Sequence, residues 1–291
     1  AAQPAPPPSL VRENATVKLT DHVWAIPDNT VGGVPNVGII VGSRATLVVD
    51  TGLGPRNGEA IVREVNKVSR NSEVYVVTTH YHPEHSLGMA AFKGAKLIMP
   101  RIQQVEMRED GPRIFDVFAG RSAANGELLR GVTYPTADIP FDTEHRLDLG
   151  GVSVRIWTKG PAFLHTRGDT VVWVEQDRVL FTGDLVMSRR FLAANQNASI
   201  RLWLTTLDEL AALNPLHVVP AHGDLGNATM IARDREYLRV VQTRVAELKR
   251  QGRSADDAAK AVAEEIAPKY PEWGNPQGSA ATARAAFNEA P

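Results

Sequence analysis

The stretch TTHYHPEHSLG, Thr78 to Gly88, places three histidines and one glutamate within six residues, directly after the strand-forming run EVYVV. The carboxyl ends of strands are where α/β proteins hold reactive groups, so this position favours a functional site over a polar loop. Residues two apart in a strand point to the same side of the sheet. His80 and His82 are therefore predicted to bind one metal ion together.

Pro83 divides this stretch into two parts. Proline cannot donate a hydrogen bond to a sheet, and it favours extended backbone at the residue before it. The chain is therefore expected to leave the sheet here, so that Glu84 and His85 turn towards a different point. A polar loop with a chance cluster of histidines is the alternative, and the rest of the sequence bears on that choice.

Three further polar residues stand at predicted strand ends. His165 precedes the strand TVVWV, Asp184 ends RVLFTGD, and His222 lies at the end of LHVVPAHGD. A shared sheet edge would bring all of them to one place, which favours a metal site over a polar loop. The remaining histidines lie away from these motifs and are expected to be structural: His22, His145 and His217.

The composition limits the chemistry. The 291 residues include no cysteine, so histidine and carboxylate are the only expected metal ligands, and thiolate nucleophiles are excluded. Lysine and arginine total 32 against 33 acidic residues, and the net charge of -1 gives no field that would attract nucleic acid. A small-molecule substrate is the expected partner, and the sequence says nothing about the oligomeric state.

The pattern of apolar residues predicts one large α/β unit. Apolar residues from Val17 to Gly52 predict opening antiparallel strands, and those of 55–70 recur at helical spacing. The elements expected next are a strand at 73–80, a helix around 87–92, a strand at 95–100 and irregular helices over 101–131. The second half repeats this style, with a helix at 205–213 before the last strand.

The two ends of the chain differ in composition from this unit. Residues 1–16 are rich in proline and are expected to form a mobile leader before the domain 17–230. Residues 231–291 are expected to form a helical extension packed on the same domain, because Tyr237 and Val241 belong to a long apolar stripe.

The start AAQPAPPPSL bears on where the protein works. Alanine-rich starts of this kind are typical of what remains after signal peptidase cleavage, which predicts a periplasmic or secreted protein. A boundary chosen by an experimenter is the alternative. No apolar run reaches the roughly 18 residues of a membrane-spanning helix, so no membrane insertion is expected.

The motifs resemble those of the metallo-β-lactamase fold superfamily, which carries a His-x-His-x-Asp-His cluster followed by a distant histidine, an aspartate and a final histidine. The match runs from Asp50 in VVDTG to His222 and covers most of the chain. The resemblance implies an α/β fold, a four-layer αββα sandwich. It also implies two metal sites: His80, His82 and His165 for one ion, Glu84, His85 and His222 for the other, and Asp184 as the bridge.

The resemblance implies two zinc ions per chain, and the same nitrogen and oxygen donors also suit iron or manganese. A metal-bound hydroxide would attack the substrate while one ion polarises its oxygen. The two carboxylates of the set, Glu84 and Asp184, are the expected catalytic residues.

Glu84 departs from the pattern of the family, which has aspartate at this position. Its extra methylene predicts a second ion that is shifted, bound less tightly or coordinated differently. The alternative is a mononuclear site on His80, His82 and His165, with Glu84 as a proton donor near the ion.

Other residues are expected to surround the metals. A ligating histidine usually donates its second ring nitrogen to a carboxylate or carbonyl, and Asp50 and Asp169 are the candidates; a turn residue and a loop cap are the respective alternatives. Substrate contacts are expected from 107–118 and from the segment MSRRFLAANQN. The side chains that would form an apolar wall there, or alternatively pack in the core, are Met187, Phe191 and Leu192.

The resemblance implies a class of enzyme and not a substrate, because one fold hosts many reactions. We expect a metal-dependent hydrolase that cleaves an ester, lactone or related acyl bond, since the Asp184 pattern looks like that of lactonases and thioesterases of the family. The alternatives are β-lactam hydrolysis, oxidation of a sulfur compound at a single iron, and a non-catalytic exported protein that binds metal for a redox enzyme.

Overall fold

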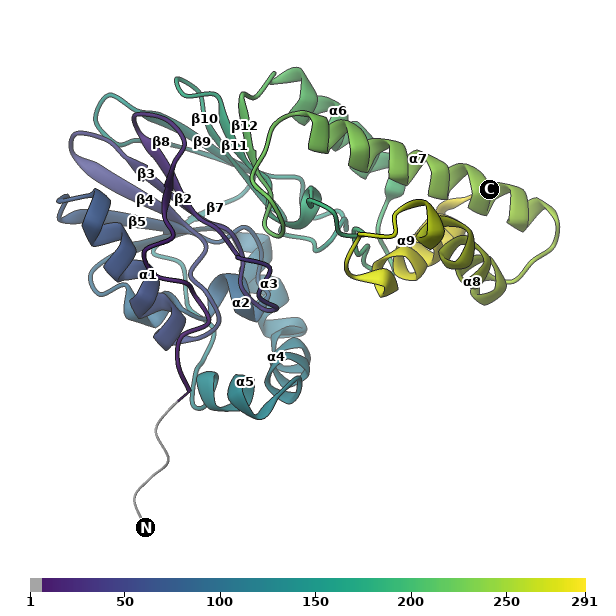
Figure 1. Cartoon of the computed structure of the whole chain (residues 1–291), viewed down its shortest axis with the longest axis horizontal. Helices are drawn as coiled ribbons and strands as arrows, with labels where there is room; N and C mark the ends of the chain where they lie inside the picture. Colours follow the sequence, from purple (N-terminus) through teal and green to yellow (C-terminus); the bar gives the residue numbers. More distant parts are fainter. Residues whose placement is uncertain (1–6) are drawn as a thin grey trace, which may run out of the picture.

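Two β-sheets packed face to face form the centre of the protein, whose computed structural model describes residues 7–291 (Figure 1). The first sheet follows chain order: β1 (Val17–Lys18), β2 (Val23–Ile26), β3 (Val37–Val41), β4 (Ala45–Val49), β5 (Glu73–Val77), β6 (Lys96–Pro100) and β7 (Ile139–Phe141). The second sheet has the order β12 (His217–Val219), β11 (Val179–Phe181), β10 (Thr170–Val174), β9 (Ser153–Thr158) and β8 (Glu144–Asp148).

Helices cover the outer faces of both sheets and extend the chain beyond them (Figure 1). The first half contains α1 (Pro55–Val68), α2 (Pro83–Ser86), the 3-10 turn η1 (Met89–Ala91), α3 (Arg101–Glu109), α4 (Gly111–Gly120) and α5 (Ala123–Leu128). The second half contains η2 (Gly183–Leu185), α6 (Ile200–Ala212), α7 (Thr229–Arg250), α8 (Ala255–Ile266), η3 (Ala267–Lys269) and α9 (Pro276–Glu289).

Buried apolar residues fill the space between the sheets and cover both outer faces. Successive side chains of a strand point to opposite faces, so Leu47 of β4 packs between the sheets while Val48 packs with Ile61 of α1. Beyond the second sheet, Trp203 of α6 and Tyr237 of α7 pack in the cluster that covers it. The resulting layers of helix, sheet, sheet and helix confirm the predicted αββα sandwich.

The strand ends bring polar residues to one edge of these layers. Strands β4, β5 and β6 pair in parallel, as do β11 and β12, so each set ends on one side. Asp50 follows β4, Asp184 follows β11 and His222 follows β12. His165 lies in the loop before β10.

The helix expected around 87–92 is much shorter than predicted. It consists of the turn η1, which follows the four-residue helix α2. Gly88 separates the two, because its N–H donates to Oγ1 of Thr51 at 3.1 Å and a Cβ there would lie 2.0 Å from the Thr51 carbonyl oxygen. Close approach of these two backbones ends the helix.

The expected leader is not separate from the domain along its whole length. Residues 1–6 lie outside the described residues, whereas 7–16 lie against α1. Oδ1 of the buried Asn57 in α1 accepts the backbone N–H groups of Leu10 and Val11 at 2.7 and 3.1 Å, and Val11 is itself buried. This differs from the expected mobile leader, since a buried amide oxygen holds the segment.

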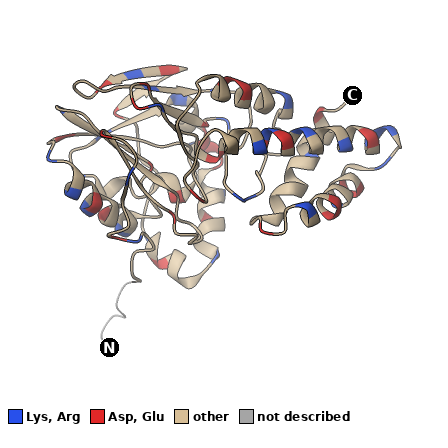
Figure 2. Ribbon diagram, turned by 45° about the horizontal axis from the view of Figure 1, so that its top comes forward, with Lys and Arg blue, Asp and Glu red and all other residues tan. Residues whose placement is uncertain are grey.

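Helices α7, α8 and α9 form a lobe beside the second sheet (Figure 1). Helix α7 starts next to α6 and runs away from the sheets, and Gly252, with φ 79°, separates it from α8. Acidic and basic residues are interspersed over this lobe and over the sheets (Figure 2). Within residues 7–291, none of the helices combines the length and the apolar composition needed to cross a bilayer.

We expect Gly58→Ala to destabilise the protein, although alanine favours helices. A Cβ at Gly58 in α1 would lie 2.3 Å from the carbonyl oxygen of Gly88 and 2.8 Å from Cβ of Ala91. Overpacking of this kind costs ~1–3 kcal/mol, which urea unfolding would measure.

Gly126 in α5 is the matched control for this substitution, since a Cβ there would have its nearest neighbour 3.5 Å away. Gly126→Ala should be neutral or stabilise by up to ~1 kcal/mol. Equal free-energy changes in the two variants would contradict the close packing of α1 on the Gly88 turn.

Candidate metal centre

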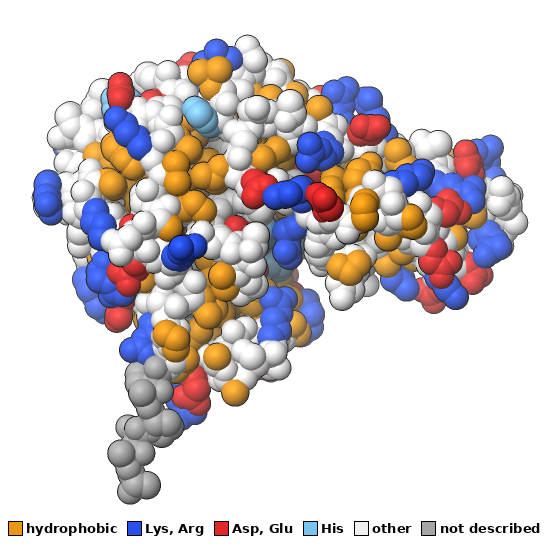
Figure 3. Space-filling view, viewed as in Figure 1, with side chains coloured by type: hydrophobic (Ala, Val, Ile, Leu, Met, Phe, Trp, Pro, Cys, Tyr) orange, Lys and Arg blue, Asp and Glu red, His pale blue; other side chains and the backbone are white. Residues whose placement is uncertain are grey.

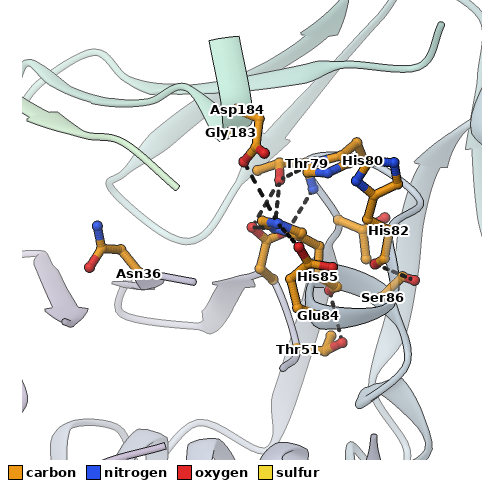
Figure 4. Close-up of polar contacts among 12 residues, drawn as sticks. Asn36, Thr51, Thr79, His80, His82, Glu84, His85, Ser86, Gly183 and Asp184 are labelled. Atoms are coloured by element: carbon orange, nitrogen blue, oxygen red, sulfur yellow. Dashed lines mark hydrogen bonds and ion pairs between the residues drawn. The ribbon is translucent and has the colours of Figure 1, made fainter. Parts of the chain in front are cut away.

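The residues predicted as ligands come together at the edge of the two sheets, several of them labelled in Figure 4. Among the described residues, groups of ligand atoms lie within 4.8 Å of one another, and none includes His22, His145 or His217. The groups are His80, His82 and His165; His80, His85 and Asp184; and Glu84, His85 and His222.

Asp184 lies between the two predicted ligand sets. Its Oδ2 is 3.2 Å from Nε2 of His165. Its Oδ1 is 3.7 Å from Nε2 of His85 and 3.7 Å from Nε2 of His222. One carboxylate therefore faces both sets, which is the arrangement that a bridging ligand requires.

The backbone around His80 and His82 is a loop and not the strand that was predicted, because β5 ends at Val77. The two rings nevertheless meet, with centroids 4.5 Å apart. His82 has φ -59° and ψ 149°, the extended backbone that Pro83 favours, and it is the N-cap of α2. This short helix then carries the other ligands of the stretch to the opposite side of the turn.

Several ligand atoms are buried without a hydrogen-bond partner. Leaving a buried polar atom unpaired costs roughly 1–3 kcal/mol, so such atoms indicate a missing partner. A cation among them would satisfy them all, and the residues present therefore fit a divalent metal. The unpaired atoms are Nε2 of His80, Nε2 of His85, Oε2 of Glu84 and Oδ1 of Asp184.

Burial keeps part of the histidine set neutral. Burial, together with neighbouring rings, lowers the pKa of His80 and of His82 well below the usual value of histidine. A neutral imidazole offers a lone pair, which is the form that binds a metal.

The buried carboxylates of the site have the opposite effect on the charge of the neighbouring histidines, because they favour the protonated form. Burial alone would lower the pKa of His85, but Asp50, Glu84 and Asp184 raise it to about 9. Burial alone would raise the pKa of Asp184, but the neighbouring histidines, His165 foremost, lower it to about 2. The buried carboxylates thus favour positive charge in this space, which a divalent cation would supply.

The longer side chain of Glu84, which replaces the aspartate of the family pattern, still places its carboxylate beside the second ligand set. Its Oε1 lies 3.7 Å from Nε2 of His85 (Figure 4). The same oxygen lies 4.0 Å from Nε2 of His222. Burial raises the pKa of its carboxyl group. Glutamate in place of aspartate at this position therefore keeps a carboxylate near both histidines.

Asp50 holds the ring of His85. Its Oδ2 lies 2.8 Å from Nδ1 of His85 and accepts the Oγ1–H of Thr79 at 2.9 Å. Its Oδ1 accepts the N–H of Thr79 at 2.7 Å. Asp50 has φ 69°, a left-handed conformation that residues other than glycine rarely adopt. A hydrogen bond to Nδ1 leaves Nε2 of His85 free for a metal.

Backbone carbonyls hold two other rings. Nδ1 of His165 lies 2.7 Å from the carbonyl oxygen of Ala193, and Nδ1 of His222 lies 3.1 Å from that of Val34. Both rings then present Nε2 to the site. No pattern in the sequence indicates these partners, because every residue has a carbonyl group.

Asp169 does not contact a histidine ring, contrary to the prediction. Its carboxylate instead accepts the N–H and Oγ1–H of Thr166 at 2.9 and 2.7 Å, so it caps its own loop. Burial raises its pKa to about 6. The alternative reading as a loop cap is the one the structure shows.

The site opens into a cavity of about 270 Å³ that is lined by ligands and by Met187. Phe191 and Leu192 do not line it, so the predicted apolar wall is wrong for these two residues. Phe191 instead packs against Tyr237, with ring centroids 5.6 Å apart, and Leu192 is fully buried in the same cluster. From the segment 107–118, Ile114, Val117 and Phe118 line the cavity.

Other residues that position the ligand loops were not predicted. Gln103 donates to the carbonyl oxygens of Thr78 and Gly168, both at 2.9 Å, and so joins the loops of His80 and His165. Asn36 donates to the carbonyl oxygens of Pro220 and Gly223, both at 2.8 Å, and so holds the loop of His222. A lone amide far away in the sequence gives no motif by which to find it.

A model of the Metallo-beta-lactamase superfamily matches residues 30–222, so the chain belongs to this superfamily and is a hydrolase of the metal-dependent class. A metallo-beta-lactamase type 2 from Bacillus cereus is 24% identical over 213 residues, covering 71% of this chain and 74% of the relative. A beta-lactamase-like protein 2 homolog from Caenorhabditis elegans is 24% identical over 224 residues, covering 74% of this chain and 66% of the relative.

Solved structures share the fold at low sequence identity. A metallo-beta-lactamase from Pontibacter korlensis has a TM-score of 0.62 at 20% identity and covers 77% of this chain and 98% of its own. The inverting sec-alkylsulfatase Pisa1 from Pseudomonas sp. has a TM-score of 0.68 at 14% identity and covers 94% of this chain and 50% of its own. A match over 94% of this chain includes most of the C-terminal helices. The match over 77% can leave these helices out.

We expect Asp50→Asn to weaken metal binding about 10- to 100-fold, because the ring of His85 loses the carboxylate that orients it. Competition with a chelator of known affinity would measure the change. Glu64→Gln is the matched control, since this buried carboxylate of α1 accepts the N–H of Asn14 and belongs to none of the groups of ligand atoms, and it should change metal affinity by less than about threefold. An equal loss of metal affinity in Asp50→Asn and in the control variant would contradict the assigned role of Asp50.

Proposed function

We propose that the protein is a dinuclear zinc hydrolase that cleaves an ester, lactone or related acyl bond. The observation that carries this proposal is the position of Asp184, whose two oxygens face His165 on one side and His85 and His222 on the other. A carboxylate shared in this way supports two ions rather than one.

The proposed ligand sets are those predicted from the sequence. The first ion would be held by His80, His82 and His165, the second by Glu84, His85 and His222, and Asp184 would bridge them. Bound ions of this kind lower the pKa of a water molecule and polarise the oxygen of a scissile bond.

The residues of the chain would provide orientation and a fixed charge. Asp184 remains ionised across the physiological range, because its pKa is about 2. The carbonyl groups of Ala193 and Val34 hold the rings of His165 and His222 in the orientation that presents Nε2 to the site. Met187 shields one side of the cavity from water, since it is buried and lines the cavity.

β-Lactam hydrolysis is the second candidate. The relatives from Bacillus cereus and from Elizabethkingia meningoseptica carry the name metallo-beta-lactamase type 2, at 24% and 22% identity. A panel that contains a lactone, a thioester, a phosphodiester and a β-lactam would separate the candidates. A β-lactam as the best substrate, by kcat/KM, would contradict the proposed acyl ester or lactone.

Metal analysis of the purified protein is the first test, and we expect about two zinc ions per chain. About one iron per chain would contradict the proposal and favour oxidation of a sulfur compound at a mononuclear site. Little metal of any kind would also contradict it and favour a non-catalytic accessory protein.

We expect Asp184→Ala and His165→Ala each to lower kcat/KM for the best substrate at least about 100-fold, because each removes a predicted ligand. Steady-state kinetics at matched protein concentration would measure this. Unchanged hydrolysis in either variant would sink the mechanism.

Glu84→Asp tests the unusual carboxylate. Because Oε1 of Glu84 already lies 3.7 Å from His85 and 4.0 Å from His222, the shorter side chain would draw the carboxyl group back from both rings. Contrary to the expectation from the family pattern, we therefore expect the second ion to be bound less tightly while the first is retained. Metal content after dialysis at graded zinc concentrations would show one ion lost before the other. Unchanged metal content and rate would show that the site does not depend on the longer side chain.

A further inference from the structure

Arg190 lines the cavity of the metal site and has no acidic partner among the described residues. Its side chain is half-buried, and its Nε is buried without a hydrogen bond. Its neighbour Arg189, by contrast, pairs with Asp224. A guanidinium group in a cavity, with no carboxylate paired to it, is a ready partner for an anionic group of a ligand.

The C-terminal lobe holds Arg190 in this place. The N–H of Gly274 donates to the carbonyl oxygen of Arg189 at 2.9 Å, and the N–H of Phe191 donates to the carbonyl oxygen of Gly274 at 3.0 Å. Nδ2 of Asn275 donates to the carbonyl oxygen of Phe191 at 2.9 Å, and Asn275 itself lines the cavity. The backbone on both sides of Arg190 is therefore fixed by a segment that directly precedes α9.

A second arginine lines the cavity from the opposite part of the fold. Arg121 follows α4, and its Cζ lies 3.5 Å from the ring centroid of Phe118, which also lines the cavity. Within the described part of the chain, no carboxylate forms an ion pair with Arg121. In the space-filling view, basic side chains border the hollow between the sheets and the C-terminal lobe (Figure 3).

The carboxylates of the cavity are engaged elsewhere. Asp28 accepts the N–H groups of Thr30 and Gly223 at 3.0 and 2.8 Å. Glu84 and Asp184 face the histidines of the metal centre. With divalent ions bound at that centre, the cavity would be positively charged overall, and an anionic substrate would be favoured.

Apolar side chains form another part of the wall. Val31 is 38% and Val117 is 46% exposed, and both line the cavity together with Ile114 of α4. Large apolar side chains exposed at a cavity favour contact with an apolar ligand. The wall thus combines unpaired guanidinium groups with an apolar surface.

We propose that the substrate is an amphiphilic anion, with its anionic group bound by Arg190 and its apolar chain packed against Val31 and Val117. This inference rests on the proposed function for the reaction, but the binding of an anion by Arg190 does not require hydrolysis. Arg121 provides a second positive charge at the cavity, and the segment Gly274–Asn275 positions Arg190.

Binding of a non-hydrolysable ligand tests the inference without the reaction. We expect the zinc-loaded protein to bind hexane-1-sulfonate in isothermal titration calorimetry and to bind the neutral 1-hexanol at least about tenfold more weakly. Arg190→Gln should raise the Kd for the sulfonate about tenfold, and Arg190→Lys, which keeps the charge, should restore part of the affinity. Equal Kd values for the sulfonate in the wild type and in Arg190→Gln would overturn the role of Arg190.

The apolar contact has its own test. Replacing hexane-1-sulfonate by propane-1-sulfonate should weaken binding about fivefold or more in the wild type, because three methylenes lose contact with the wall. Val117→Ser should reduce this ratio, and since Val117 is exposed, the variant should fold normally. An unchanged ratio would contradict the apolar wall. Leu216→Ser, at an exposed apolar residue outside the cavity, is the matched control.

Hydrolysis separates this inference from the proposed function. The 4-nitrophenyl monoester of adipic acid and 4-nitrophenyl hexanoate have acyl chains of equal length, and only the first ends in a carboxylate. We expect Arg190→Gln to lower kcat/KM about tenfold for the adipate ester and less than about threefold for the hexanoate. If both esters are hydrolysed and Arg190→Gln lowers kcat/KM equally for the two, the inference is overturned while the proposed function stands. Sulfonate binding that depends on Arg190, with neither ester hydrolysed, would support the inference and count against the function.

Discussion

The carboxylate of Asp50 is the interaction on which the rest of the site depends. It joins the end of β4 to the loop after β5 through Thr79, and to α2 through the ring of His85. Asp50 adopts a left-handed backbone conformation to do this, and that strain persists because three hydrogen bonds converge on one side chain. Thr79, directly before the HYHPEH stretch, and His85, at its end, are thereby fixed relative to the first sheet, before any metal is considered.

The metal centre and the fold therefore share their stability. The ligand atoms that lack partners lower the stability of the protein without metal, and a ligand that binds only the folded chain raises it. The metal centre lies at the edge of both sheets because its residues follow four different strands, β4, β5, β11 and β12. The ends of these strands meet only at that edge.

The positions of the polar residues at strand ends could be predicted from the sequence itself, because each signal is local, whereas the four layers and the division of the ligands into two sets were implied by the resemblance to the family. Histidines and carboxylates at strand ends identify the site, and apolar periodicity identifies elements such as α1 and β4. The errors share a different cause, which is contact between distant segments. Gly88 lies against Thr51, and Phe191 and Leu192 pack in the cluster of the C-terminal helices, so neither the short η1 nor the lining of the cavity follows from local pattern.

The contact between Arg190 and the segment before α9 also has a consequence for how the chain is made. Synthesis proceeds from the N-terminus at about 5–20 residues per second, so Asn275 leaves the ribosome on the order of seconds after His222. All the proposed ligands have then emerged, while the last part of the cavity wall has not. The ligands of the site and the segment that positions Arg190 thus become available for folding at different times, although both belong to one cavity.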